Sequence, residues 1–578
     1  MASETRNCQN CHKDFQIEPD DFGFYEKIKV PAPTWCPECR FMRRFTFRND
    51  RSLYWRECAL CGKKMMAMFP SDRPFKVYCS ECWWSDKWDP VSYGRSYDFS
   101  KPFLTQFSEL INSVPLLNVW AFSNVNSEYA NYGAFNKNFY LSYGTVNSED
   151  IFYSFMINES KNCFDCYWVR KSELCFEGHN AIGSYNSKFL VNCRNCVDSW
   201  FLFDCANCQD CFMCTGLRSK SFYIRNRQYS REDYLKELDK IGTGSYETLE
   251  RLKREFDVLI KSSVHKFSIT AMTTNSTGDD LTSAKNAKHV FYGDNIENLR
   301  YSWWVVNYKD SYDVVGSLDS ELMYEVSVGA FHNYMSKFVT HSQGSRYSEY
   351  SYLCHTNSNI FGSIGLRNKQ YCILNKQYTK EEYESLVPKI IKHMNDMPYV
   401  DKKGRVYRYG EFFPPELSPF AYNETIAQEY FPLTKEQAIE QGYRWKDPDT
   451  RDYKVTLKSN DLPDHIKDVK DSIVNEIIQC AHNETCNEQC TRAFKVITEE
   501  LTFYRRMNLP LPRLCPNCRH YQRLKQRNPL KLWHRSCMCD KNSHQHGAEK
   551  CPNEFETSYA PDRKEVVYCE QCYNSEIV

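Results

Sequence analysis

The sequence of 578 residues lacks both a long apolar run and an excess of charge of one sign. It contains no stretch of about 18 apolar residues, and residues 1–11 are polar where a secretion signal would carry an apolar core. The 74 basic residues equal the 74 acidic ones, so affinity for a nucleic acid or a membrane must come from local patches. We expect a soluble cytoplasmic protein without a membrane partner.

Recognisable catalytic motifs are missing as well. The sequence has no HExxH, GxSxG or phosphate-binding loop, and Gly242-Thr243-Gly244-Ser245 lacks the lysine that would complete such a loop. The histidines of the central region are scattered, and each is better explained as a structural residue than as a base. No catalytic residue is predicted, and the sequence leans against an enzyme without deciding the question.

Cysteine, in contrast, is abundant, with 29 residues. In a reducing compartment, pairs spaced CxxC indicate metal ligands before disulfides. Because zinc takes four thiolates in a tetrahedron, four such pairs near the amino terminus predict two sites. We pair the first two and the last two, although interleaved pairing stays open; the predicted ligands are Cys8, Cys11, Cys36, Cys39, Cys58, Cys61, Cys79 and Cys82.

The carboxyl terminus repeats this pattern. Cys490 and Cys515 are separated by the same 25 positions as Cys11 and Cys36. The register predicts a second set of ligands, namely Cys486, Cys490, Cys515, Cys518, Cys537, Cys551, Cys569 and Cys572. The insert Met538–Lys550 adds Cys539, which competes with Cys537, together with His544 and His546. We expect about four structural zinc ions per chain.

A family resemblance supports zinc. Phe15–Arg40, with Phe24-Tyr25, Pro31 and Cys36-Pro-Glu-Cys39-Arg40, resembles the zinc-ribbon (treble-clef-like) family of small bacterial domains, and the match recurs near the carboxyl terminus. The whole layout resembles bacterial multi-zinc proteins with an Asn/Cys/aromatic repeat and no assigned reaction. The resemblance implies zinc binding and transfers no catalytic residue.

Basic segments lie between the two expected sites of each module. Arginine forks suit phosphates, and neighbouring aromatic side chains suit stacked bases. Solvated faces are the alternative. The candidate nucleic-acid contacts are Arg40, Arg43, Arg44, Arg48 and Arg51 in the first module, and Arg519, Arg523, Lys525, Arg527 and Arg535 in the second.

The central region is an internal duplication. Lys161–Asp165 returns as Lys309–Asp313, and Ile224–Ser230 returns as Ile373–Thr379. The offset grows from 148 to 149, so one residue has been gained or lost. Phenylalanine recurs every 10 to 13 residues from Phe139 to Phe222, which indicates short strands that stack into a parallel solenoid. An antiparallel meander is the alternative, but its Asn-Gly and Asp-Gly turns are scarce.

The first copy also contains nine cysteines. Its C-x2-C-x2-C-x2-C run, Cys205 to Cys214, invites an iron–sulfur cluster or a further metal. In the second copy, however, Cys163 becomes Ser311 and Cys214 becomes Ser363, which a ligand position would not accept. We therefore expect these cysteines to fill space in the interior, with a further metal as the open alternative.

The fold class predicted is mainly β: a duplicated parallel β-solenoid-like core with helical caps, flanked by two tandem zinc-ribbon/treble-clef modules. Capping boxes at Ser230 and Thr379 predict the helices that close each copy. A further amphipathic helix is expected from Leu462, after an extended linker over residues 402–461. The domains predicted are 1–90 (first zinc module), 91–118 (helical linker), 119–229 (copy 1), 230–287 (helical connector), 288–378 (copy 2), 379–480 (helical cap and linker) and 481–578 (second zinc module).

Function is the least determined feature. The leading hypothesis is a non-enzymatic, zinc-stabilised binding scaffold that contacts RNA, DNA or a ribonucleoprotein through the basic zinc modules. A protein–protein assembly module that forms a homo-oligomer is the second hypothesis. An enzyme that acts on a polymer in the solenoid groove is the third.

Overall fold

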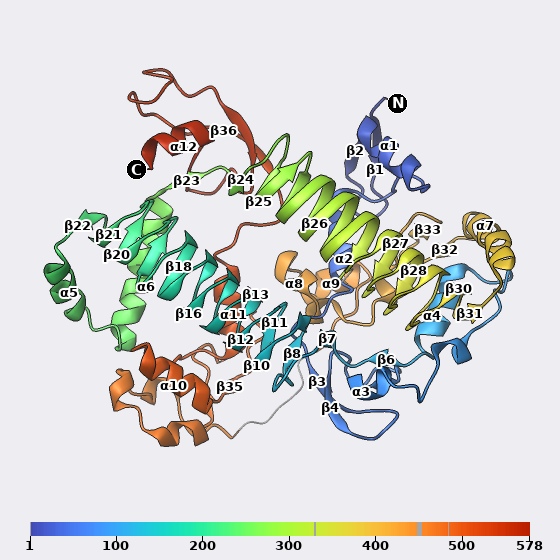
Figure 1. Cartoon of the computed structure of the whole chain (residues 1–578), viewed down its shortest axis with the longest axis horizontal. Coiled ribbons are helices and arrows are strands. Elements are labelled where there is room, and N and C mark those ends of the chain that lie inside the picture. Colours follow the sequence, from blue (N-terminus) through green and yellow to red (C-terminus); the bar gives the residue numbers. More distant parts are fainter. Residues whose placement is uncertain (1, 329–330, 448–453, 484, 578) are drawn as a thin grey trace.

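The computed structural model describes residues 2–328, 331–447, 454–483 and 485–577 and is mainly β (Figure 1). Two large sheets consist almost entirely of parallel strands, and we call them the first stack (residues 130–228) and the second stack (residues 270–377). The cysteine-rich ends form an amino-terminal module (residues 4–83) and a carboxyl-terminal module (residues 478–576). None of the described helices has the length and apolar character needed to cross a bilayer.

The first stack is a 14-stranded sheet in which the chain pairs with itself every 12 residues. Glu149 pairs with Lys161, Lys161 with Glu173, and Glu173 with Tyr185, all in parallel. This pairing excludes the antiparallel meander. The strands are β8 (Ala130–Asn131), β10 (Lys137–Tyr140), β11 (Ser142–Tyr143), β12 (Glu149–Phe152), β13 (Phe155–Asn158), β14 (Lys161–Phe164), β15 (Tyr167–Arg170), β16 (Glu173–Phe176), β17 (His179–Ile182), β18 (Tyr185–Arg194), β19 (Trp200–Phe203), β20 (Gln209–Thr215), β21 (Ser221–Ile224) and β22 (Arg227–Gln228).

The second stack is an eight-stranded sheet with the same 12-residue repeat. Between β26 and β27 the register widens to 13, since Glu321 pairs with Tyr334, and this extra residue explains the change of offset in the duplication. Parallel pairing already begins at Thr270. The strands are β24 (Thr270–Ala271), β25 (Gly278–Lys285), β26 (Lys288–Ser327), β27 (Tyr334–Thr340), β28 (Arg346–Tyr352), β29 (Ser358–Phe361), β30 (Gln370–Ile373) and β31 (Lys376–Gln377).

A left-handed backbone bend at every third residue produces the short repeat. Asn162, Asp165, Trp168 and Lys171 all have φ between 50° and 60°. Asparagine and aspartate tolerate this conformation better than other side chains, which explains their abundance here. Their side chains also bond from one turn to the next, as Asn286 does to Asn298 (3.1 Å).

The interior cysteines of the first stack occupy a position that serine can also fill. Cys163 Sγ lies 3.4 Å from the Lys161 carbonyl oxygen and 3.8 Å from that of Ser172. Ser142 Oγ lies 3.1 Å from each of the two equivalent carbonyl oxygens. In the second stack, Ser311 takes the place of Cys163 and donates to the Lys309 carbonyl (2.8 Å). Thiol and hydroxyl thus satisfy the same backbone groups.

Helices close the stacks and join them to the modules. Ser230 caps α5 (Arg231–Asp239), and a complete capping box at Thr379 starts α7 (Lys380–Asp396). These helices contact β21 and β30 near the end of each stack, as expected for caps. The remaining central helices are α4 (Phe103–Ile111), α6 (Tyr246–Ser262), α8 (Ile426–Tyr430) and α9 (Lys435–Glu440). Positions 448–453 of the expected linker lie outside the described residues.

The helix expected from Leu462 is wrong. The segment forms short 3-10 turns at Ile466–Asp468 and Asp471–Asn475. Arg513 donates to the Ser459, Leu462 and Pro463 carbonyl oxygens, so a buried guanidinium takes the acceptors that the first turn of a helix would use. The apolar side chains are buried as predicted, but through turns.

The two modules are built alike from two-stranded sheets and short helices. The amino-terminal module contains β1 (Glu4–Asn7), β2 (Asp14–Ile17), α1 (Pro19–Lys27), α2 (Pro37–Phe45), β3 (Tyr54–Glu57), β4 (Lys64–Ala67), β5 (Val77–Tyr78) and α3 (Ser80–Trp83). The carboxyl-terminal module contains β34 (Ile478–Gln479), β35 (Ala493–Phe494), α10 (Thr498–Arg506), α11 (Pro516–Leu524), β36 (Trp533–Ser536), β37 (Glu554–Thr557), β38 (Val566–Tyr568) and α12 (Glu570–Glu576). Smaller pairings involve β6 (Leu116–Leu117), β7 (Ala121–Phe122), β9 (Gly133–Ala134), β23 (Val264–Lys266), β32 (Tyr399–Val400) and β33 (Val406–Tyr407).

Each module docks on the stack that is farther from it in the sequence. The amino-terminal module lies against the second stack, where α2 contacts β26. The carboxyl-terminal module lies against the first stack, where Phe503 of α10 stacks on Phe164 at 3.8 Å. Each module contains two of these two-stranded sheets, namely β1–β2, β3–β4, β34–β35 and β36–β37. In Figure 1 the four sheets lie around the outside of the pair of stacks.

Candidate metal centres and the cavity between the stacks

In each of four places, four cysteine sulfurs lie within 4.8 Å of one another. In the amino-terminal module the pairing is the consecutive one, not the interleaved one. The sulfurs of Cys11 and Cys36 are 3.7 Å apart, and those of Cys61 and Cys79 are 3.9 Å apart. A tetrahedral zinc with bonds of about 2.3 Å would separate its sulfurs by about 3.8 Å, so the donor sets fit such a metal ion. The four sets are Cys8/Cys11/Cys36/Cys39, Cys58/Cys61/Cys79/Cys82, Cys480/Cys490/Cys515/Cys518 and Cys537/Cys551/Cys569/Cys572.

The four sets share one local geometry at a helix start. Cys36, Cys79, Cys515 and Cys569 are N-cap residues, so their sulfurs sit at the positive end of a helix dipole. Their own amides donate back across each site, as Cys79 N does to Cys58 Sγ (3.3 Å). Burial would raise the pKa of Cys58, but backbone N–H donors outweigh it and lower that pKa to about 7. At Cys58 the thiolate form that a metal needs is thus favoured.

The structure changes one predicted ligand in the carboxyl-terminal module. Cys480, not Cys486, takes the position of Cys8, because the Cys515 amide donates to Cys480 Sγ (3.2 Å) as the Cys36 amide does to Cys8 Sγ (3.2 Å). A longer loop separates Cys480 from Cys490 and carries Cys486, whose sulfur still lies 3.7 Å from that of Cys518. Cys486 was predicted because only three residues separate it from Cys490, which is close to the CxxC spacing. The strand partner Phe494, which matches Phe15, was the available signal for β34 and the cysteine after it.

Cys537 and Cys539 turn out not to compete. Cys537 belongs to the four-cysteine set, and its sulfur accepts from the Cys569 amide (3.2 Å). Cys539 joins His544, His546 and Cys572 in a separate group. The insert therefore adds donors without replacing any.

The arginines of α2 in the amino-terminal basic segment are buried, which differs from the surface placement expected from the sequence. Arg40, Arg43 and Arg44 are at most 1% exposed. They face carboxylates of the second stack: Arg40 and Arg44 each lie 2.9 Å from Asp313, and Arg43 lies 2.7 Å from Glu325. Burial opposes ionisation of Glu325, but Arg43, Arg44 and Arg40 outweigh it and lower its pKa. These guanidinium groups join module to stack.

The carboxyl-terminal segment makes the equivalent contact. Arg519 and Arg523, both buried, lie 2.7 Å and 2.6 Å from Asp165, which is the duplicate of Asp313. Arg48 is likewise buried and pairs with Asp50 (2.7 Å). Nucleic acid cannot reach these arginines in this fold. The other candidates remain partly or fully accessible, namely Arg51, Lys525, Arg527 and Arg535.

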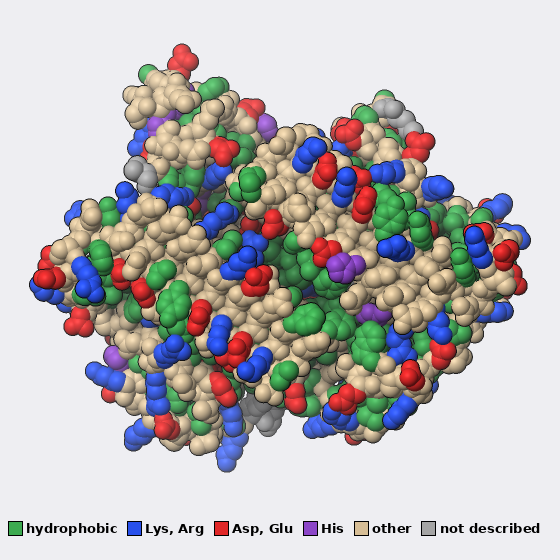
Figure 2. Space-filling view, in the orientation of Figure 1, with side chains coloured by type: hydrophobic (Ala, Val, Ile, Leu, Met, Phe, Trp, Pro, Cys, Tyr) green, Lys and Arg blue, Asp and Glu red, His purple; other side chains and the backbone are tan. Residues whose placement is uncertain are grey.

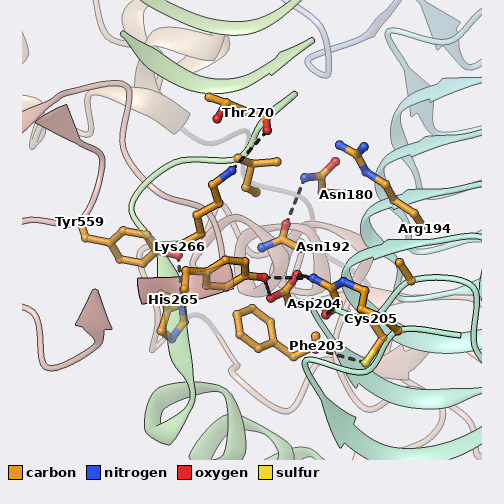
Figure 3. A pocket seen from close by; sticks show the side chains of 14 residues that line it. Asn180, Asn192, Arg194, Phe203, Asp204, Cys205, His265, Lys266, Thr270 and Tyr559 are labelled. Carbon is orange, nitrogen blue, oxygen red and sulfur yellow. Dashed lines mark hydrogen bonds and ion pairs between the residues drawn. The ribbon is translucent and has the colours of Figure 1, made fainter. Parts of the chain in front are cut away.

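A cavity of about 290 Å³ opens between the first stack, the start of the second stack and the carboxyl-terminal module (Figure 3). Phe203, His265, Tyr559 and Tyr573 contribute rings to its lining. Asp204 accepts hydrogen bonds from Tyr573 and from Arg218 (3.0 Å), and Arg218 also donates to the Tyr573 hydroxyl (3.1 Å). The exposed Arg194 lines the same cavity, and no dashed line reaches its guanidinium in Figure 3.

A second cavity, of about 150 Å³, adjoins the first and shares Asn180, Asn192 and His265 with it. Two of its buried polar groups have unpartnered atoms: both ring nitrogens of His179, and Oδ2 of Asp280. Burial lowers the pKa of His179 to about 4 and raises that of Asp280 to about 6. The linked cavities thus combine aromatic walls with polar groups that lack partners, as ligand sites do.

Arginine recurs along one column of the first stack. Successive parallel pairings align Arg170, Ile182, Arg194, Ala206 and Arg218. Adjacent turns of a parallel sheet lie about 4.8 Å apart, so successive arginines are separated by roughly 10 Å. On the face drawn in Figure 2, basic and acidic side chains are intermixed.

No protein-family model and no curated protein sequence matches the chain. Among solved structures, the chain is similar to a protein from Desulfovibrio desulfuricans G20 that is provisionally described as an acetyltransferase. The identity is 10%, and the match covers 52% of this chain and 76% of the other, with a TM-score of 0.11. A likeness this weak carries no argument about fold or activity.

Proposed function

We propose that this chain is a zinc-stabilised binding scaffold that takes single-stranded RNA into the cavity between its stacks. In this proposal the four cysteine sets hold zinc in modules of the zinc-ribbon type, and each stack is a β-solenoid. The modules fix the two solenoids relative to one another through buried arginines, and the cleft between the solenoids carries the ligand.

The arginine column is the observation that carries the proposal. Arg194 and Arg218 of this column line the cavity, and Arg170 lies two turns before Arg194 in the same column, so positive charge recurs beside the cavity for a phosphate backbone. Arg218 pairs with Asp204 (3.0 Å), and the exposed Arg194 is therefore the charge that the test removes. Phe203, Tyr559 and Tyr573 supply ring faces for bases in the same space. The volume of about 290 Å³ suits a ligand group of nucleotide size.

The test is the binding of a fluorescent oligoribonucleotide over a range of salt concentrations. Arg194→Ala removes an exposed charge from the cavity wall, and we expect about a tenfold loss of affinity, since a charge-assisted bond is lost. The slope of log K against log salt should fall by about 0.7, as for one released counterion.

Arg254→Ala is the matched control, because Arg254 is exposed on α6 and does not line either cavity. The control should bind as the wild type does. Equal affinities for the two variants, or no binding by the wild type, would overturn the proposal. Arg43→Ala is unsuitable as a binding probe, because Arg43 is buried between Glu325 and Glu411 and its loss would disturb the contact of module and stack.

A further inference from the structure

The insert of the carboxyl-terminal module brings together three donors that have no counterpart at the amino terminus. Cys58 and Cys61 are separated by two residues, whereas the equivalent Cys537 and Cys551 enclose the 13-residue insert Met538–Lys550. The described part of this insert contains no helix or strand, yet Cys539 is only 1% exposed and the His544 side chain only 6%. Something other than backbone pairing holds the segment.

The three side chains converge with metal-ligand geometry. His544 Nδ1 lies 3.1 Å from Cys539 Sγ, and His546 Nε2 lies 3.3 Å from the same sulfur. Two donors on one zinc, a sulfur at about 2.3 Å and a nitrogen at about 2.1 Å, are separated by about 3.6 Å. The arrangement of the three donors is therefore only slightly tighter than that around a bound zinc ion.

The outer nitrogen of each histidine has its own partner. His544 Nε2 lies 3.1 Å from Glu576 Oε1, and His546 Nδ1 lies 2.6 Å from the Glu549 carbonyl oxygen. Metal-binding histidines are oriented in this way, with the remaining ring N–H donated to a carboxylate or carbonyl. Each ring thus directs its inner nitrogen toward the cysteine sulfur.

The fourth donor is a sulfur that already belongs to the adjacent set. Cys572 lies within 4.8 Å of Cys539, His544 and His546, and equally within reach of Cys537, Cys551 and Cys569. Its sulfur is 3.7 Å from that of Cys551. Seven side chains can therefore give two ions four donors each only if one thiolate serves both.

We propose that the carboxyl-terminal module holds a fifth zinc on Cys539, His544 and His546, with Cys572 as a thiolate bridge to the zinc of the neighbouring four-cysteine set. Five thiolates and two Zn²⁺ ions leave a net charge of −1, smaller than the −2 of a closed four-cysteine site, so the pair is well neutralised. The proposal rests on the proposed zinc occupancy of the four-cysteine sets.

Metal counting on the full-length protein tests it. We expect five zinc ions per wild-type chain by elemental analysis and four in the His544→Ala/His546→Ala variant, which leaves the four-cysteine set intact. His534→Ala is the matched control, because His534 is exposed in the same module and bonds only to Glu554 and Glu556. It should keep all five.

Cobalt substitution tests the bridge separately. Two Co²⁺ ions that share a thiolate are magnetically coupled, so the fully loaded wild type should lose electron paramagnetic resonance intensity that the histidine variant retains. Four zinc ions in a folded wild type, with no change in the variant, would overturn the fifth site and leave the proposed scaffold standing. Five ions without coupling would overturn the bridge, and fewer than four would contradict the scaffold as well.

Discussion

The contact of the amino-terminal module with the second stack and that of the carboxyl-terminal module with the first stack are two versions of one interface. Arg40 and Arg44 meet Asp313 as Arg519 and Arg523 meet Asp165. The aromatic contact is also repeated, since Phe24 stacks on Tyr312 at 3.9 Å and Phe503 on Phe164 at 3.8 Å. Duplication has thus preserved an interface between elements that are far apart in the chain.

The two versions differ in how completely their charges are paired. The amino-terminal contact adds Arg43 with Glu325 and Glu411. Lys337 of the second stack has Glu349 at 2.9 Å, whereas the equivalent Lys188 lies over the Trp200 ring at 3.4 Å and donates to the Met507 carbonyl. The carboxyl-terminal contact therefore has fewer carboxylates to pair with its buried arginines. We expect the loss of one carboxylate to lower the free energy of unfolding more there than at the amino-terminal contact.

The largest expected effect comes from the metal sets. Cys480→Ser should remove about one zinc per chain, as Cys8→Ser should, because structural zinc sites contribute about 10–16 kcal/mol of binding free energy. Cys486→Ser should keep the full zinc content, since Cys480 holds the position of Cys8. Elemental analysis measures both, with the interior Cys354→Ser as control. Zinc loss from Cys486→Ser alone would reverse the assignment.

Next in size is the removal of the shared aspartate. Asp165→Asn removes the carboxylate that pairs with both buried arginines and leaves Glu500 in ion-pair contact with Arg519, so we expect a loss of about 3–5 kcal/mol of unfolding free energy. Asp313→Asn should lose less, because Arg44 keeps Glu325 at 2.8 Å. Urea unfolding compares the two. The exposed Asp257→Asn serves as control and should stay within about 0.5 kcal/mol of the wild type; a similar value for Asp165→Asn would contradict the interface.

The two lysines sharpen the comparison further. Burial lowers the pKa of Lys188 to about 7, whereas a lysine in the unfolded chain has a pKa of about 10.4. Below pH 10.4 this difference therefore reduces the free energy of unfolding. The reduction becomes smaller as pH rises from 7 toward 10.4. Between pH 7 and pH 9 the wild type should gain about 2–3 kcal/mol relative to Lys188→Met. Lys337→Met should instead be destabilising at pH 7, because it removes the charge partner of Glu349. Urea unfolding curves at pH 7 and pH 9 measure these free energies. A difference between the wild type and Lys188→Met that is the same at both pH values would contradict the lowered pKa of Lys188.

The smallest effect concerns acid stability. Burial lowers the pKa of His341 and of His355 to about 3, and the first stack has Asn192 and Ala206 at the equivalent positions. Below pH 6.5 these histidines are protonated in the unfolded chain but stay neutral in the folded chain. The free energy of unfolding therefore decreases as pH falls from 6.5 toward 3. Each histidine should account for about 2 kcal/mol at pH 5. His341→Asn should flatten the fall between pH 6.5 and pH 5 by that amount, and an unchanged slope would contradict the buried neutral state.

The sequence predicted features whose signal lies within a short window or an exact repeat. Paired cysteines such as Cys36 and Cys39, the caps at Ser230 and Thr379, and the repeat that ends at Thr379 all belong to this kind. The burial of Arg40 could not be predicted from the sequence, because its partner Asp313 lies 273 residues away. The residues next to Arg40 in the sequence do not show whether its side chain is buried or exposed. The turns near Ile466 were missed for the same reason, since Arg513 supplies the deciding contacts.

The crosswise docking also sets the order in which the chain can mature on the ribosome. Arg40 emerges 273 residues before Asp313, and at a synthesis rate of about 5–20 residues per second its guanidinium waits roughly 15–55 seconds for the carboxylate that will neutralise it. Arg519 emerges 354 residues after Asp165 and finds its acceptor already made. In the proposed zinc-stabilised scaffold, the amino-terminal module is therefore the part of the nascent chain that needs its metal early, because the proposed zinc ions can bind it before the second stack has been synthesised.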